Sequence, residues 1–562
     1  MPKFKITNGP LPRRLASRLP ATGAVTLAAT LLTAVTAFAG TGPPPVAPMS
    51  LTAAALAGTG SPMAPASFTS TALTGTGSPT APTSSASAAL TGTSPAAGEI
   101  GPASVDRFVN AYREATGLPG AAVAVTRGNE VVHVAGYGRT SSGDPVTADT
   151  PMAIASLSKS FTSLAVMQLV EKGAVRLDEP VRVRLPEFVM ADPRAARITV
   201  RQLLDQTSGM ADEAFPERSL PQPRSLREAV ARLRGARLAA DPGMRWSYHN
   251  TNSQVAARLV EVASGMPFAG YLGKHVFGPL GMRNSTTIDT ERDLPASARG
   301  HLRLLGAALA LPEPPGFGNG SGGVISSARD MAQWMIMQNG GGIGPGGVRV
   351  VSAASVAEMR TPSRINDSYA LGWSIGTTRK GSPVVEHGGD LLTATAQQTL
   401  LPRSGYGIVV MANTGTAYAD SDAIADALVA MAEGEEPEPP PSVSPSLIID
   451  LAMALAAAAT LLLAGRGLAR SRRWAARRAD RPAWRAAARL LPYAAPGVLC
   501  LTITDVFAVL ARGKDTTWRH VAYLYPSFMI WLVLATGACL ALILVRIGHL
   551  VRTRRAPSPG SG

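Results

Sequence analysis

Cysteine and lysine are both scarce in this sequence. The 562 residues include two cysteines, Cys500 and Cys539, and both lie in apolar runs near the C-terminus. The large central region therefore has no disulfide and no zinc site built on thiolates, so its hydrophobic core must hold it together. Of the 53 basic residues, seven are lysines and all the others are arginines. A lysine inside an apolar segment therefore suggests a role that arginine cannot fill.

Acidic residues are nearly missing from three basic segments. The chain has a formal net charge of +15, and residues 1–20, 466–489 and 546–562 carry net charges of +5, +8 and +4. The rest of the chain is therefore close to neutral. All three segments flank apolar runs, as basic loops of membrane proteins do. The charge pattern predicts a membrane protein and argues against a nucleic-acid partner.

The N-terminal hundred residues have the composition of a targeting segment and a linker. Residues 1–39 combine a basic stretch with a small apolar run that ends in Ala37-Phe38-Ala39, the form of a signal-peptidase site. They are either a cleaved signal peptide or an uncleaved N-terminal anchor. Residues 40–101 are rich in Ala, Gly, Pro, Ser and Thr and contain a 17-residue repeat. Because they hold few large apolar side chains, we expect a flexible linker.

Further changes of composition divide the rest of the chain. Residues 102–433 have a globular composition, and an acidic, Pro-rich linker follows at 434–446. Three apolar runs then predict membrane-spanning helices, at residues 447–465, 490–511 and 523–545. The basic loop 466–489 and the basic tail 546–562 should be cytoplasmic. The pattern predicts a cell-membrane protein whose large domain is extracytoplasmic, the side to which the N-terminal segment also directs it.

Residues 102–433 predict an α/β domain of the α+β type. Residues 104–117 have helical spacing, and residues 121–138 indicate a β-hairpin. A helix should follow Ser156, and mixed helix and loop extend to about residue 345. Strands and a closing helix at 415–433 complete the pattern, the strands being YALGWSI, SPVVEHGG, AQQTLLP and YGIVVMANT. The sheet would therefore be built from both ends of the domain.

The segment AIASLSKSFTS, residues 153–163, places a serine three residues before one of the rare lysines. On a helix, Ser156 and Lys159 would share a face and could hydrogen-bond. A serine hydroxyl is a weak nucleophile without a neighbouring base. Lysine can be that base if burial lowers its pKa from about 10.4, whereas arginine does not deprotonate in proteins. Alone, S-x-x-K is common by chance, and Ser158 and Ser160 are competing candidates.

A second motif, RWSYHNTN, carries Tyr248 and Asn250. A tyrosine near a lysine cation ionises more easily and can relay protons, and an asparagine amide can bind a substrate carbonyl. Taken alone, the motif is better explained as an ordinary loop in which Asn250 caps the next helix.

A third motif, His387-Gly388-Gly389, lies in a predicted strand. Glycines in a strand allow a ligand backbone to approach closely, and the N–H of Asp390 could be an oxyanion donor. Taken alone, a glycine bulge with a chance histidine is the simpler interpretation.

In the order S-x-x-K, Y-x-N, H-G-G, the motifs resemble those of the serine hydrolase family of class C β-lactamases, D-alanyl-D-alanine carboxypeptidases and related esterases. Other segments of residues 102–433 are also similar to the family, namely ITVRQLLDQTSGM, FGPLGMRNST, SGGVISSARDMAQWM and YALGWSI. The resemblance implies an antiparallel sheet flanked by helices, with a helical subdomain and the site between them.

The resemblance also implies a role for each motif residue. Ser156 would be the acylated nucleophile, Lys159 its base partner, and Tyr248 the general base for the leaving group or the deacylating water. The substrate-binding residues would be Asn250, His387, Gly388, Gly389 and Asp390. The backbone N–H groups of Ser156 and Asp390 would form the oxyanion hole. No cofactor or metal is implied, and the sequence has neither an H-E-x-x-H nor a Walker-type motif.

Three features depart from the family pattern. His387 stands where many relatives have the lysine of K-T-G, so a permanent cation that could meet a substrate carboxylate is missing. Gln206 stands where histidine is usual, and we expect a structural effect. After H-G-G the chain continues with DLLTATAQ instead of Pro-Gly-aromatic, so the strand edge and the pocket should differ.

These patterns predict a membrane-anchored, extracytoplasmic serine hydrolase that works through an acyl-enzyme on amide or ester bonds. The substrate would be a small peptide or ester, such as a cell-wall D-amino-acid peptide, and strong β-lactamase activity is less expected. The alternative is a non-catalytic binding or sensing module of the same fold, coupled to the C-terminal spans. Turnover of activated esters that is lost in Ser156→Ala would separate the two hypotheses.

Overall fold

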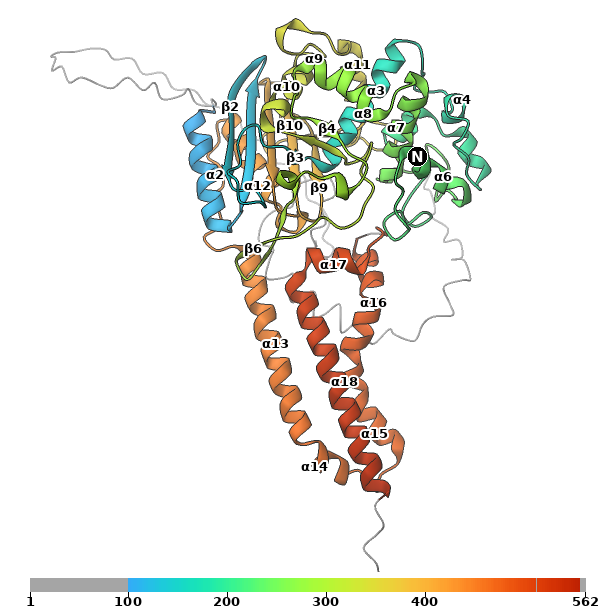
Figure 1. Cartoon of the computed structure of the whole chain (residues 1–562), viewed down its shortest axis with the longest axis vertical. Coiled ribbons are helices and arrows are strands. Elements are labelled where there is room, and N and C mark those ends of the chain that lie inside the picture. The colour runs from blue at the N-terminus through green and yellow to red at the C-terminus, as the bar shows by residue number, and fades with distance from the viewer. Residues whose placement is uncertain (1–99, 512, 556–562) are drawn as a thin grey trace, which may run out of the picture.

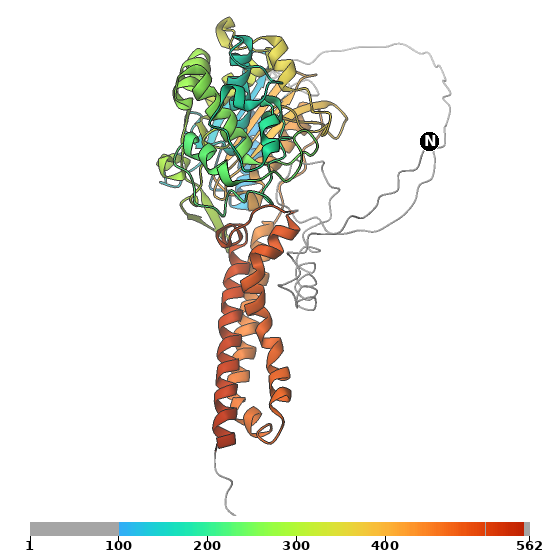
Figure 2. The ribbon, with the colours of Figure 1, turned by 90° about the vertical axis from the view of Figure 1, so that its right-hand side faces the viewer.

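A computed structural model describes residues 100–511 and 513–555 (Figure 1). The predicted signal or anchor, the repeat-containing linker up to residue 99 and the end of the basic tail lie outside the described residues. The described chain forms a head of sheet and helices at one end of a bundle of three long helices (Figure 2).

The head is built around a six-stranded antiparallel sheet. Its strands are β1 (Gly120–Arg127), β2 (Glu130–Gly138), β8 (Ser374–Thr377), β9 (Pro383–Asp390), β10 (Thr395–Leu401) and β11 (Tyr406–Ala412). In space they follow the order β2-β1-β11-β10-β9-β8. Strand β1 pairs with β11, with Val123 opposite Val410, so both ends of the domain's sequence meet inside one sheet. The predicted fold class is confirmed, including the contribution of both ends to the sheet.

Helices cover both faces of this sheet. They are α2 (Pro102–Thr116), α3 (Ser158–Glu171), α10 (Ala328–Asn339) and α12 (Asp420–Ala432). Side chains alternate along a strand, so Val123 of β1 packs into a core with α2 and α12. The next residue, Ala124, packs into the larger core that contains α3 and α10. Helix α3 is buried along nearly its whole length, which makes it the central helix of the head.

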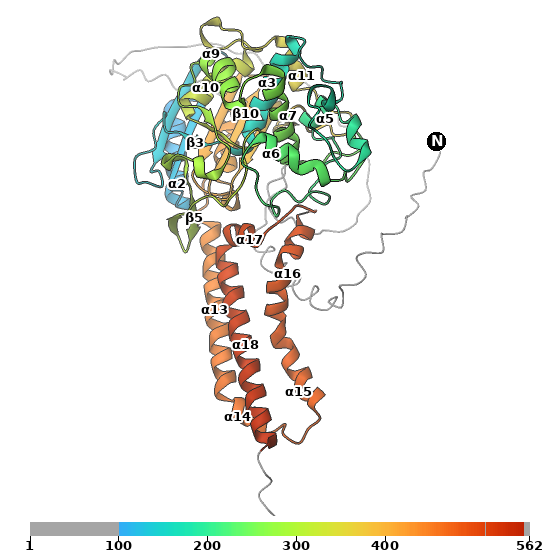
Figure 3. The same ribbon diagram turned by 45° about the vertical axis from the view of Figure 1, so that its right-hand side comes forward.

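A helical region lies on the side of the head away from α2 (Figure 3). Its helices are α4 (Val181–Arg184), α5 (Val200–Leu204), α6 (Leu226–Ala231), α7 (Asn250–Ser264), α8 (Phe268–Leu272) and α11 (Ala353–Met359). The short helix α9 (Gly278–Leu280) packs against α10. Two small sheets complete the head, one formed by β3 (Met152–Ala153), β4 (Thr286–Thr287) and β7 (Val324–Ser326), and one by β5 (His301–Leu304) and β6 (Ala307–Ala310). The second sheet lies near α13. Helix α7 packs against α3, which brings the second motif to the first.

Two predicted elements are shorter than expected. YALGWSI was predicted as a strand, but β8 begins at Ser374. Gly372 adopts a φ of +75°, which no extended strand allows, and its N–H donates to the main-chain oxygen of Leu204 (3.3 Å). The closing helix begins at Asp420, after a separate turn at Thr416–Tyr418.

Three helices after the head are long and apolar enough to cross a membrane: Pro445–Ala469, Ala483–Leu510 and Pro526–Arg555. They overlap the three predicted spans. The first is α13 and the last is α18, while the second joins α15 (Ala483–Leu490) to α16 (Ala495–Leu510) through a short turn. Helices α14 (Ser471–Ala476) and α15 lie at the end far from the head, and α17 (Trp518–Leu524) lies beside it (Figure 3). The basic loop and the head are therefore at opposite ends of the bundle.

Candidate active site

The turn before α3 holds Ser156 beside Lys159. Residues Ala155–Leu157 form a single 3-10 turn, and Ala155 has a φ of +48°, a left-handed conformation that is strained for a residue other than glycine. The Nζ atom of Lys159 lies 3.1 Å from the Oγ atom of Ser156. The structure thus brings together the two residues of the S-x-x-K motif at the start of a rigid, buried helix.

Lys159 is 1% exposed and surrounded by acceptors. Its Nζ donates to Oδ1 of Asn250 (2.9 Å) and to the main-chain oxygen of Ser321 (2.8 Å). Burial lowers the pKa of Lys159 from 10.5 to about 7 because it disfavours the charged form. A neutral amine has two N–H groups and one lone pair. With both N–H groups taken by Asn250 and Ser321, the lone pair is free to face the hydroxyl of Ser156.

Tyr248 completes this cluster in its protonated form. Its ring centroid lies 4.7 Å from Nζ of Lys159. Burial raises the pKa of Tyr248 well above its usual value, although a hydrogen bond with Ser156 lowers it in part. At neutral pH the phenol can donate or relay a proton, but it is not a ready base. The resting site therefore presents Lys159 as the candidate base, and the general-base role expected of Tyr248 stays a prediction.

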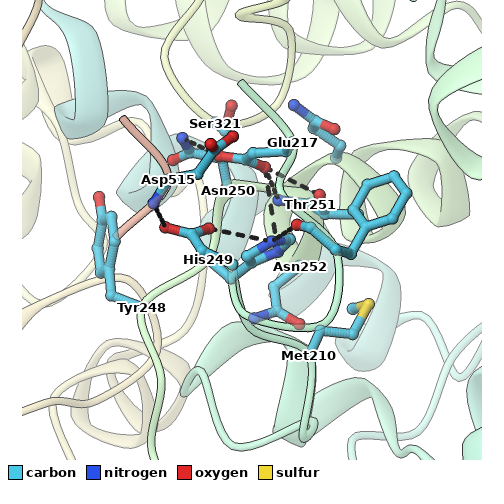
Figure 4. A network of polar contacts seen from close by, with 12 residues as sticks. Met210, Glu217, Tyr248, His249, Asn250, Thr251, Asn252, Ser321 and Asp515 are labelled. Carbon is cyan, nitrogen blue, oxygen red and sulfur yellow. Dashed lines mark hydrogen bonds and ion pairs between the residues drawn. The ribbon is translucent and has the colours of Figure 1, made fainter. Parts of the chain in front are cut away.

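Glu217 fixes the orientation of Asn250 (Figure 4). Its Oε1 accepts a hydrogen bond from Nδ2 of Asn250 (2.7 Å), and its Oε2 accepts two from Thr251. Burial would raise the pKa of Glu217, but His249, Arg218 and these hydrogen bonds hold it below the usual value. The amide of Asn250 is thereby turned so that its oxygen faces Lys159 and its nitrogen faces a carboxylate.

His249 links this network to the segment that carries Glu217. Its Nε2 lies 3.0 Å from the main-chain oxygen of Phe215, which must accept the hydrogen bond, and 3.3 Å from Oδ1 of Asp212. Gln206 supports the same stretch, since its Oε1 accepts hydrogen bonds from the N–H of His249 (2.9 Å) and from Nδ2 of Asn252 (2.7 Å). Gln206 therefore has the structural role that was expected at this departure from the family pattern.

His387 is a neutral, fully enclosed residue on β9. It is 4% exposed, its Nε2 lies 3.2 Å from the hydroxyl of Tyr369, and its Nδ1 donates to the main-chain oxygen of Gly388 (2.6 Å). Burial, together with the nearby Lys159, lowers the pKa of His387 to about 3. The site has no cation at the position where the K-T-G lysine of many relatives would stand.

Gly389 lets β9 run directly against the turn that carries Ser156. A Cβ at this position would lie 2.3 Å from the main-chain oxygen of Ile154 and 3.2 Å from Cβ of Ala155. No other residue fits at this distance without displacing the backbone. Asp390 is the next residue and ends β9, so its N–H lies at the same edge of the sheet, and its part in an oxyanion hole stays a prediction.

A sequence model described as Beta-lactamase matches residues 105–431, more than half of the chain. The chain belongs to the beta-lactamase family. It is 31% identical over 335 residues to penicillin-binding protein 4 of Amycolatopsis lactamdurans, a match that covers 56% of this chain and 85% of that protein. It is 27% identical over 311 residues to protein flp of Staphylococcus aureus (strain MW2), covering 54% and 61%.

A solved structure also resembles the head. The octameric penicillin-binding protein homologue from Pyrococcus abyssi has a TM-score of 0.51 and 25% sequence identity, and the match covers 63% of this chain and 81% of that one. The family resemblance inferred from the three motifs is confirmed by these comparisons.

The two other serines next to Lys159, Ser158 and Ser160, form hydrogen bonds that stabilise the turn. The Oγ of Ser158 donates to the main-chain oxygen of Ala155 (2.6 Å) and accepts from the N–H of Val324 (2.9 Å). The Oγ of Ser160 donates to the main-chain oxygen of Leu157 (2.7 Å). Both hydroxyls are buried and tie the turn to its neighbours, which leaves Ser156 as the nucleophile candidate.

Several residues that shape the site were not found from the sequence. Glu217 lies in an irregular loop, Ser321 acts through its main-chain oxygen, and Tyr369 lies in a segment predicted as a strand. None of the three belongs to a motif that carries chemistry by its spacing. Within the described parts of the chain, no group of three or more His, Cys, Asp or Glu side chains is arranged to hold a metal ion.

Proposed function

We propose that this beta-lactamase family protein is a membrane-anchored serine hydrolase that cleaves amide or ester bonds through an acyl intermediate on Ser156. One observation carries the proposal: the hydroxyl of Ser156 lies 3.1 Å from a buried amine whose pKa is about 7. A lysine at that pKa is about half neutral at neutral pH and can act as a general base.

The reaction would begin with the attack of Oγ of Ser156 on the substrate carbonyl carbon. The proton of Ser156 passes to the lone pair of Lys159 as the new C–O bond forms, and the carbonyl oxygen takes the negative charge. The backbone N–H groups of Ser156 and Asp390 would stabilise this oxyanion. Collapse breaks the bond to the leaving amine or alcohol, which receives its proton from Lys159 through the phenol of Tyr248. Water then attacks the acyl carbon as its proton passes along the same path to Lys159. Collapse breaks the bond between the acyl carbon and Oγ of Ser156, Lys159 returns the proton to Oγ, and the acid leaves.

The substrate class follows from the polar groups around the nucleophile. Asn250 presents an amide for a substrate carbonyl or N–H, and the glycine edge of β9 allows an extended peptide backbone to lie beside it. A small peptide or ester, such as a cell-wall D-amino-acid peptide, fits these groups. Because His387 is neutral, the site offers no fixed charge there for a substrate carboxylate, so we expect weak β-lactamase activity.

The head would face the outside of the cell. Basic residues of the loop 466–489 lie at the end of the bundle away from the head, and basic loops of membrane proteins stay in the cytoplasm. The head, at the opposite end, would then be extracytoplasmic and within reach of cell-wall substrates.

Intact-mass spectrometry of the full chain in detergent tests the proposal. The protein is treated with a fluorophosphonate and, separately, with benzylpenicillin, with Ser156→Ala treated alongside. We expect a fluorophosphonate adduct that is absent from the mutant, and turnover of an activated ester that is lost with it. A folded wild-type protein that gives no adduct with either reagent would refute the proposal.

A second candidate, a non-catalytic sensing module, gains support from one contact. The loop that joins the second and third membrane helices touches the Tyr248 motif through Lys514. A sensor would need a physical link of this kind between its binding site and its spans. A folded protein that binds D-amino-acid peptides without any acylation of Ser156 would favour this candidate.

A further inference from the structure

Residues 513–517, the loop between α16 and α17, return from the membrane helices to the candidate active site. The Nζ atom of Lys514 donates a hydrogen bond to the main-chain oxygen of Tyr248. It also lies 3.7 Å from Oδ2 of Asp212 and 5.5 Å from the ring centroid of Tyr248. The Lys514 side chain is 19% exposed, so this lysine is part of the wall of the site and not a loose surface group.

Asp515, the next residue, forms hydrogen bonds with Asp212 and Ser219 of the head. Its backbone N–H donates to Oδ2 of Asp212 (3.1 Å). Its carboxylate accepts hydrogen bonds from the N–H of Ser219 (2.7 Å) and from the Ser219 hydroxyl. Asp212 and Ser219 bracket the segment that carries Glu217, so the loop holds this segment at both ends.

The groups that the loop holds are those that position the reactive atoms. Asp212 contacts the ring of His249, and Glu217 orients the amide of Asn250, which in turn accepts from Lys159. Tyr248 lies close to two lysine side chains, with its ring centroid 4.7 Å from Nζ of Lys159 and 5.5 Å from Nζ of Lys514. Figure 4 shows Asp515 beside this network, together with Tyr248, His249 and Asn250.

Other contacts fix the membrane helices to the head away from the site. Asp450 of α13 accepts from the N–H of Leu305 (2.7 Å), and the hydroxyl of Tyr523 donates to the main-chain oxygen of Pro312 (2.9 Å). The bundle is therefore attached at several points, and the loop 513–517 is the attachment that reaches the Tyr248 motif. A displacement of α16 or α17 would be transmitted to Tyr248 through Lys514.

We propose that the membrane loop 513–517 is a working part of the active site, in which Lys514 and Asp515 are positioning residues for Tyr248 and for the segment that carries Glu217. This inference rests on the proposed hydrolase function. It makes the catalytic competence of the head depend on how the second and third membrane helices hold this loop, so the spans are more than an anchor.

The charge of Lys514 also acts on the base of the reaction. Besides burial, the charged groups around Lys159 are Glu217 and Asp390, which raise its pKa, and Arg218 and Lys514, which lower it. The neutral rings of Tyr248 and His387 face the same amine. Removing Lys514 should therefore raise the pKa of Lys159 and shift the acidic limb of the activity profile to higher pH.

The experiment compares kcat/KM for an activated ester across pH 5–9, using the full chain in lipid nanodiscs. The variants are Lys514→Ala and Asp515→Asn, and the matched control is Lys380→Ala, an exposed lysine that donates to the main-chain oxygen of Glu433. We expect Lys514→Ala to lower kcat/KM by about 10–100-fold, as small misplacements of reactive groups do, and to shift the acidic limb upward. Asp515→Asn should lower kcat/KM without a comparable shift, because Asp515 is not among the charged groups with the largest effect on the pKa of Lys159. Lys380→Ala should match the wild type.

Each other outcome has a clear meaning. An active wild type with unchanged kcat/KM and pH profile in both loop variants would overturn the inference and leave the proposed function intact. A uniform loss at every pH that follows a fall in melting temperature would show a merely structural contact and overturn it too. Higher activity in Lys514→Ala would mean that the loop blocks the site, and it would also overturn the inference. A folded wild type without ester turnover or acylation of Ser156 would overturn the proposed function, and this inference with it.

Discussion

Replacing Lys159 with methionine should remove a specific pH dependence of stability together with the activity. Burial lowers the pKa of Lys159 from 10.5 to about 7, and one pKa unit corresponds to about 1.4 kcal/mol. Keeping the proton on this amine in the folded protein therefore costs up to about 5 kcal/mol relative to the unfolded chain. Methionine has a similar length and carries no charge, so the variant does not bear this cost.

The sign of the effect follows from where the proton is lost. Between pH 7 and pH 10.5 the unfolded chain keeps the proton of Lys159 while the folded protein has released it, so wild-type stability rises with pH. From pH 7 to pH 9 this contribution amounts to about 2 kcal/mol. The loss of hydrogen bonds to Asn250 and Ser321 in Lys159→Met also changes stability, but it does not vary with pH and cancels from the comparison.

The assay is guanidinium unfolding of the full chain in detergent at pH 7 and pH 9, followed by tryptophan fluorescence. Lys172→Met is the control, because Lys172 is an exposed lysine at the C-terminal end of the same helix. We expect wild type and Lys172→Met to gain about 2 kcal/mol more than Lys159→Met between the two pH values. Ester turnover by Lys159→Met should fall by about 10²–10⁴-fold, the usual effect of losing a general base.

Equal pH dependence of stability in wild type and Lys159→Met would refute the reasoning. It would mean that Lys159 stays charged in the folded protein up to pH 9. A charged amine cannot take the proton of Ser156, so the base would have to be sought elsewhere in the cluster.

Two further predictions concern packing around the site and within the head. Gly389→Ala should lower kcat/KM for an ester by about 10²-fold, because its Cβ would lie 2.3 Å from the main-chain oxygen of Ile154. Gly376→Ala, whose Cβ would make an ordinary 3.5 Å contact, should keep wild-type kinetics, and equal activity of the two variants would contradict the close-approach argument. Asp420→Ala should lower the free energy of unfolding by about 3–5 kcal/mol, since it leaves Arg303, which is 4% exposed and 2.8 Å from Asp420, as a buried charge without its partner. A loss below about 1 kcal/mol in guanidinium titration, the range of exposed ion pairs, would show that this pair behaves as a surface one.

The sequence patterns that predicted the fold are local ones. The hairpin of β1 and β2 followed from alternation and a Gly-Asn turn, and the helix after Ser156 from an apolar run behind a serine. YALGWSI failed as a strand because the turn at Gly372 is stabilised by a contact with Leu204, which is distant in the sequence. Alternation of apolar residues cannot report such a contact.

The same distinction between local and distant contacts applies to the candidate site. Ser156 and Lys159 are three residues apart, so helical geometry alone brings them together. Glu217 was not foreseen, since its role depends on the fold placing an irregular loop against Asn250. The contact of Lys514 with the Tyr248 motif could not be predicted either, because its partners lie more than 260 residues earlier in the chain. The scarcity of lysine singles out Lys514 as much as Lys159, but Lys514 lies in no motif of known chemistry.

The pairing of β1 with β11 has a consequence for how the head folds. Val123 and Val410 are neighbours in the sheet, although nearly the whole domain lies between them in sequence. Closing so long a loop has a large entropic cost, and folds dominated by distant pairings fold slowly. The sheet cannot be completed before β11 has been synthesised. Helix α13, the first helix in the described part of the chain that is long and apolar enough to cross a membrane, follows soon after, at Pro445. The sheet can therefore close at nearly the same moment of synthesis at which α13 becomes able to enter the membrane.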